Sequence, residues 1–104
     1  MSADDTANSP NPGPAESGPA ITIYTTGLCP FCHQAKRLLN QKGADYHEID
    51  VTFSADKRAA MRERAGGRNT VPQIFVGDRH VGGCDDLYAL EQQGLLDSLL
   101  KGQD

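Results

Sequence analysis

Two cysteines separated by two residues, Cys29 and Cys32, are the strongest chemical signal in the chain. They lie between an alternating β-rich run (21–24) and an amphipathic run typical of a helix (34–40). Pro30 suits the first position of a helix, because its φ is already helical and its missing N–H has no helical partner there. We therefore expect a helix that begins at Pro30, with Cys29 as its N-cap.

The start of that helix favours a thiolate on Cys29. The first N–H groups of a helix have no backbone partner, and the helix dipole is positive at this end, so a negative sulfur is stabilised there. Cys32 follows one turn later on the same face, close enough to form and break a disulfide with Cys29. The pair predicts a thiol–disulfide redox site.

The charge and length of the chain restrict the possible partners. With 104 residues it has room for one compact domain. All ten basic residues and all but three acidic residues lie within 20–104, so this domain is nearly neutral. We therefore expect neither a nucleic acid nor a membrane as partner. No apolar run is long enough to span a bilayer.

Three cysteines make an odd number without a framework of pairs, which does not fit a secreted disulfide scaffold. The first residues also lack the basic start and the apolar stretch of a secretory signal, so we expect a cytoplasmic protein. Residues 1–19 contain four of the six prolines and almost nothing to bury, which predicts a disordered tail before a domain at 20–104.

The remaining elements follow from hydrophobic period and turn residues. They are a strand at 46–51, a helix from Ser54 to about Ala65, a hairpin of 70–76 and 79–81 around Gly77-Asp78, and a helix from Cys84 interrupted near Gly94. Strand–helix–strand units pair their strands in parallel, and hairpins pair theirs antiparallel. The order βαβαββα therefore predicts an α/β fold, a four-stranded mixed sheet flanked by helices.

Three motifs, at 29–32, 70–72 and 82–86, occur in an order and at a spacing that resemble the dithiol glutaredoxins of bacteria, the CPYC-type class I proteins. A CxxC pair at a strand-to-helix junction is itself a thioredoxin-like signal. The resemblance covers residues 20–101 and implies a thioredoxin-like fold. It also implies glutathione-dependent reduction of protein–glutathione mixed disulfides and protein disulfides, with Cys29 as the attacking thiolate and Cys32 as the resolving thiol.

The resemblance also implies a glutathione site. The bond before Pro72 would be cis, and the Val71 backbone would pair with the cysteinyl part of glutathione. The backbone of Cys84 and Asp85, at a helix N-terminus, would bind the γ-glutamyl carboxylate, and Asp86 the α-ammonium. Gly82 and Gly83 would let the tripeptide approach the backbone. The predicted glutathione-binding residues are Phe31, Arg68, Thr70, Val71, Pro72, Gly83, Cys84, Asp85 and Asp86.

Two positions depart from the family pattern. Phe31 stands where Tyr is common, which removes a hydroxyl but keeps the aromatic wall. Thr26 stands where the family often has a lysine that favours the thiolate and pairs with the glycyl carboxylate of glutathione. We therefore expect Arg68 to be the partner of that carboxylate.

Cysteines in proteins also bind metals and iron–sulfur clusters. A structural zinc site needs four ligands, and Cys84 and the three histidines lack the required spacing, so no metal is expected. A glutathione-ligated [2Fe–2S] carrier and a redoxin reduced by thioredoxin reductase are the alternative functions. Fresh brown protein would indicate the former, and a coupled assay with each reductant would identify the latter.

The other polar residues receive simpler interpretations. We expect Cys84 to be a neighbour of the glutathione site without a catalytic role, and His33 to be a bystander. Arg58, Arg62 and Arg64 are expected to form the solvated face of their helix. The resemblance implies glutathionylated or disulfide-containing proteins as partners, ribonucleotide reductase and sulfate-assimilation enzymes among them. We expect a monomer.

Overall fold

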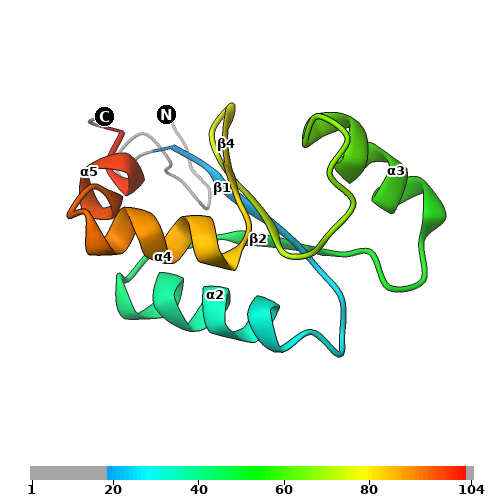
Figure 1. Cartoon of the computed structure of the whole chain (residues 1–104), viewed down its shortest axis with the longest axis horizontal. Helices are drawn as coiled ribbons and strands as arrows, with labels where there is room; N and C mark the ends of the chain where they lie inside the picture. The colour runs from blue at the N-terminus through cyan, green and yellow to red at the C-terminus, as the bar shows by residue number, and fades with distance from the viewer. Residues whose placement is uncertain (1–18, 103–104) are drawn as a thin grey trace, which may run out of the picture.

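The computed structural model describes residues 19–102, so the predicted disordered tail at 1–19 lies outside the described residues except for Pro19. Figure 1 shows the elements in chain order. They are β1 (Ile21–Thr25), α2 (Pro30–Gln41), β2 (His47–Asp50), α3 (Ala55–Arg64), β3 (Gln73–Val76), β4 (Arg79–Gly82), α4 (Cys84–Gln92) and α5 (Leu96–Leu100). The predicted order is confirmed, and the last helix is interrupted at Gly94, whose φ of +74° a helix does not allow.

The four strands form one mixed sheet in the order β2-β1-β3-β4. β1 pairs in parallel with β2 and antiparallel with β3, and β4 completes the hairpin with β3. Ile23 in the centre of β1 lies opposite Glu48 on one side and Ile74 on the other. The thioredoxin-like α/β arrangement expected from the sequence is thus present.

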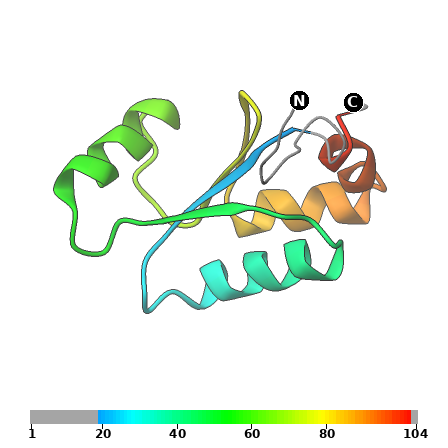
Figure 2. The same cartoon turned by 180° about the vertical axis from the view of Figure 1, so that it is seen from behind.

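Two separate cores cover the two faces of the sheet, because alternate residues of a strand point to opposite faces. Ile21 and Ile23 of β1 belong to the larger core, where they pack with α2, α4 and α5. Tyr24, next along β1, belongs to the smaller core, where Met61 of α3 and Phe75 of β3 are also buried. Accordingly, α2 and α4 lie side by side along the sheet, whereas α3 stands apart from them (Figures 1 and 2).

Two arginines of α3 do more than face solvent, which corrects the expectation for this helix. Arg58 donates to the side-chain and backbone oxygens of Asn69 at 3.0 and 2.8 Å. Arg64 donates to the hydroxyl of Tyr24 at 3.3 Å, and its guanidinium lies 4.2 Å from the centre of the Phe75 ring. Met61 is the one fully buried side chain of α3. These arginine contacts therefore help to attach a helix that buries little apolar surface.

Within residues 19–102, no helix has the length and apolar composition needed to cross a membrane.

Candidate active site

The first turn of α2 holds the two cysteines as the sequence predicts. Cys29 is the N-cap, with extended backbone (φ −122°, ψ 105°), and Pro30 begins the helix. The backbone N–H of Cys32 donates to the sulfur of Cys29 over 3.1 Å. A cap that accepts a hydrogen bond from the first turn is stabilised further when it carries negative charge, because the helix dipole has its positive end here. The Cys29 sulfur therefore lies at the positive end of the α2 dipole.

The two thiols differ in their surroundings. Cys32 is completely buried, and Cys29 retains 7% of its surface exposed. Burial and the hydrogen bond with the Cys29 side chain, with a further contribution from the charge of Cys29, raise the pKa of Cys32 to about 12. Cys32 is therefore protonated at neutral pH.

The loop before Cys29 is held by polar residues that the sequence analysis did not single out. The Gly27 N–H donates to the Thr52 hydroxyl over 2.9 Å. Both the N–H and the hydroxyl of Thr52 donate to Asp50, at 2.8 and 2.5 Å, which lowers the pKa of that carboxyl group. The hydrogen bonds from Thr52 to Asp50 form a common local turn that the Asp-x-Thr sequence could have indicated. The hydrogen bond from Gly27 to Thr52 joins residues 25 positions apart, and no local sequence pattern predicts it.

A second set of polar contacts involves Thr25, the last residue of β1. The hydroxyl of Thr25, which is buried, donates to Glu48 over 2.7 Å, and Lys36 of α2 donates to the same oxygen over 3.0 Å. The hydrogen bond from Thr25 lowers the pKa of Glu48, and the hydrogen bond from Lys36 lowers it further by a smaller amount. This cluster ties β1, β2 and α2 together beneath the cysteine loop.

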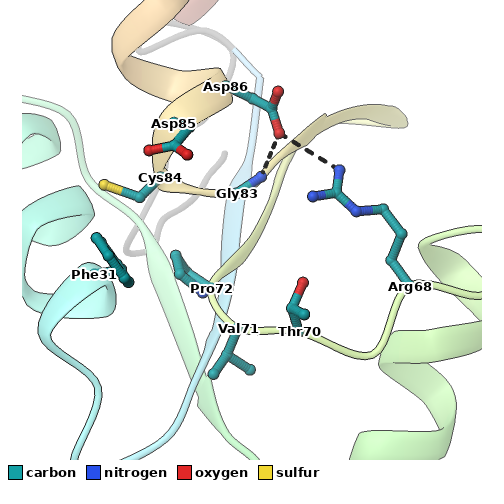
Figure 3. Close-up of a pocket in the computed structure, with 9 residues that line it drawn as sticks. All are labelled: Phe31, Arg68, Thr70, Val71, Pro72, Gly83, Cys84, Asp85 and Asp86. Carbon is teal, nitrogen blue, oxygen red and sulfur yellow. Dashed lines mark hydrogen bonds and ion pairs between the residues drawn. The ribbon is translucent and has the colours of Figure 1, made fainter.

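All nine residues predicted to bind glutathione line one cavity of about 260 Å³. In Figure 3, Phe31 and Cys84 stand at one end of it and Arg68 at the other, with Thr70, Val71 and Pro72 along one side. The Val71–Pro72 bond is cis, as expected from the resemblance. The sulfur of Cys29 lies 3.8 Å from the carbonyl oxygen of Val71. The reactive sulfur therefore lies against a residue that lines the cavity.

Asp86 links the opposite side of the cavity to Arg68. Its Oδ2 accepts from the N–H of Gly83 at 2.9 Å and from Arg68 Nη1 at 3.4 Å. Gly82 has φ +113°, and a Cβ added there would overlap this carboxylate. The sequence suggested that both glycines make room for a ligand, but the missing side chain of Gly82 leaves space for Asp86.

Cys84 and His33 do not join the reacting pair. Cys84 is buried, burial raises the pKa of its thiol, and its sulfur lies 3.9 Å from the side-chain oxygen of Gln34. His33 is exposed, and its backbone N–H donates to the carbonyl of Cys29 at 3.2 Å. Across residues 19–102, no three His, Cys, Asp or Glu side chains are grouped so that they could hold a metal ion.

Comparison with known proteins gives a consistent family assignment. The family model described as Glutaredoxin matches residues 21–81. Glutaredoxin 3 of Escherichia coli K12 is 53% identical over 81 residues, which cover 78% of this chain and 96% of the relative. The solution structure of glutaredoxin from Brucella melitensis is 55% identical, with a TM-score of 0.74 over 90% of this chain and 98% of that one. A buckwheat glutaredoxin–glutathione complex is 32% identical, with a TM-score of 0.71 over 82% and 78% of the two chains.

The two glycines of this site allow a matched test of its packing. We expect Gly82→Ala to lower the free energy of unfolding by about 1–3 kcal/mol, because the new methyl group displaces the Asp86 carboxylate and the positive φ becomes strained. Gly83→Ala is the control, since Gly83 has φ −93° and its nearest atom to a new Cβ is 3.5 Å away. Denaturant unfolding measures both, and equal losses in the two variants would contradict this packing.

Proposed function

The chain belongs to the glutaredoxin family and is a glutathione-dependent thiol–disulfide oxidoreductase with a Cys29–Cys32 pair, and we propose that its preferred substrates are protein–glutathione mixed disulfides. The observation that carries the proposal is the position of the Cys29 sulfur. It is capped by the Cys32 N–H and lies 3.8 Å from the carbonyl oxygen of Val71, which lines the 260 Å³ cavity. A disulfide formed on Cys29 thus has a cavity beside it for the glutathione half.

The proposed reaction begins with the Cys29 thiolate attacking the glutathionyl sulfur of the substrate. A disulfide forms between Cys29 and glutathione, the substrate disulfide breaks, and the substrate sulfur leaves as a thiolate that takes a proton from water. A second glutathione, as its thiolate, then attacks the glutathionyl sulfur. Oxidised glutathione leaves and the Cys29 thiolate is regenerated, returning to the stabilising end of α2.

For a protein disulfide, Cys29 forms a mixed disulfide with the substrate and Cys32 resolves it. Cys32 must lose its proton first, and its pKa is raised chiefly by burial and further by the side-chain hydrogen bond and the charge of Cys29. Once Cys29 is bound in a disulfide, its negative charge no longer opposes loss of the Cys32 proton. Two glutathione molecules then reduce the Cys29–Cys32 disulfide.

The charged groups around the cavity match the ends of glutathione. We assign the γ-glutamyl carboxylate to the backbone N–H groups of Cys84 and Asp85 at the start of α4, and the α-ammonium to Asp86. The glycyl carboxylate is assigned to Arg68. Arg68 and Asp86 pair with each other at 3.4 Å, so the ligand would replace one exposed ion pair with two. The buckwheat relative, solved as a glutathione complex, supports a site of this kind.

The partners proposed for this reaction are glutathione and glutathionylated or disulfide-containing proteins. Three free cysteines, two of them in a pair that must be reduced to react, suit a reducing compartment. We therefore place the protein in the cytoplasm.

Single-cysteine variants test the assigned roles. Cys29→Ser should abolish turnover of a glutathionylated substrate and of a protein disulfide, because the nucleophile is lost. Cys32→Ser should retain turnover of the glutathionylated substrate, which needs one thiolate only, and lose dithiol reduction. The assay couples oxidised glutathione to NADPH through glutathione reductase. Loss of both activities in Cys32→Ser would show that the roles are wrong.

Arg68→Ala tests the carboxylate assignment. We expect the KM for glutathione to rise about 3- to 10-fold with little change in kcat, because an ion pair at a half-exposed site is lost. Arg62→Ala removes the same charge from the exposed surface of α3 and should leave the KM unchanged. An unchanged KM in Arg68→Ala, or an equal rise in Arg62→Ala, would refute a specific contact.

A further inference from the structure

Gln73, the first residue of β3, is a fully buried polar side chain. It follows Pro72 directly, yet neither the reaction nor the predicted glutathione site uses it. A buried amide is costly unless its donors and its acceptor find partners. The contacts of Gln73 therefore indicate what its burial achieves.

The Gln73 side chain connects the edge hairpin to the loop beside the cavity. Its Nε2 donates to the carbonyl oxygen of Thr70 at 3.0 Å and to the Thr70 hydroxyl at 3.1 Å. Its Oε1 lies 2.7 Å from Nε2 of His80 in β4. A carbonyl oxygen only accepts, so the amide nitrogen must face Thr70, and His80 must donate its Nε2–H to Oε1.

His80 is itself held in place. Its ring stacks on Phe75 with centroids 4.8 Å apart and planes inclined by 21°. Burial and, secondarily, the positive charge of Arg68 lower the pKa of His80, against the opposing effect of Asp86. At neutral pH the ring is thus uncharged and has one N–H, which the contact with Gln73 places on Nε2.

The far end of this chain of hydrogen bonds reaches the reactive sulfur. Thr70 precedes Val71, and both line the cavity, as Figure 3 shows. The carbonyl of Val71 lies 3.8 Å from the Cys29 sulfur. Thr70 itself is exposed, so burial does not fix its backbone, and the double hydrogen bond from Gln73 supplies that restraint.

We propose that Gln73 and His80 are positioning residues, which hold Thr70 and Val71 in the orientation that binds the glutathione half of the substrate. The proposal rests on the proposed function, because the hydrogen bonds from His80 through Gln73 to Thr70 are assigned a role in that same glutathione cavity. Neither side chain touches the reacting atoms. Their loss should therefore weaken binding of glutathione more than it slows the bound complex.

The test compares KM and kcat for a glutathionylated peptide in the coupled glutathione reductase assay. Gln73→Leu keeps the volume but removes the donors to Thr70, and should raise the KM about 5- to 10-fold with kcat changed less than about 2-fold. His80→Phe keeps an aromatic ring stacked on Phe75 but removes the N–H that donates to Gln73, so it should also raise the KM. His80→Gln, which restores an N–H donor, should recover most of the affinity.

Two controls separate positioning from general loss of stability. Val76→Ala shortens a buried side chain at the other end of β3 and should lower stability without raising the KM. The double variant Gln73→Leu/His80→Phe should have a KM no higher than that of Gln73→Leu alone. Both substitutions interrupt the same series of hydrogen bonds, so the second has nothing further to remove.

Unchanged KM values in Gln73→Leu and His80→Phe would overturn the proposal, as would effects that multiply in the double variant or an equal rise in Val76→Ala. Normal turnover by the wild-type protein in the same assay keeps these outcomes separate from the proposed function. Absence of wild-type turnover would refute that function, and this proposal with it.

Discussion

The hydrogen bond from the Cys32 N–H to the Cys29 sulfur is the interaction on which the site depends. It exists only because a helix begins at Pro30, so that the first-turn N–H groups point at the residue before it. Burial of Ala35, Leu38 and Leu39 against the sheet fixes the direction of that helix. Packing in the core thus determines the electrostatic environment of the nearly buried Cys29 sulfur.

The rest of the site is assembled from parts of the chain that are distant in sequence. The hydrogen bond from Gly27 to Thr52 holds the cysteine loop, while Asp86 accepts from Gly83 and from Arg68 on the far side of the cavity. Each contact fixes a backbone segment or a charged side chain beside the cysteine loop or the cavity. The protein therefore supplies a shaped, polar surface beside the two thiols that carry the sulfur chemistry.

Local patterns predicted the features that depend on neighbouring residues. Pro30 indicated where α2 begins, and Gly77 indicated the turn of the hairpin. The order and spacing of the three motifs indicated the family. The features that were missed depend on tertiary contacts. Arg64 is exposed as expected, but its guanidinium also lies over the Phe75 ring, and Gly82 leaves space for the Asp86 side chain. A sequence period shows which face of a helix is apolar, but it does not show which partner a long polar side chain reaches.

The most direct test of this account is to map the adduct formed when Cys32→Ser is incubated with oxidised glutathione at neutral pH. Cys32 cannot then resolve the product, so the mixed disulfide should accumulate. We predict one glutathione per protein by mass spectrometry, attached at Cys29, with buried Cys84 unmodified. An adduct at Cys84, or folded protein without any adduct, would contradict the assignment of Cys29 as the stabilised nucleophile beside the glutathione cavity.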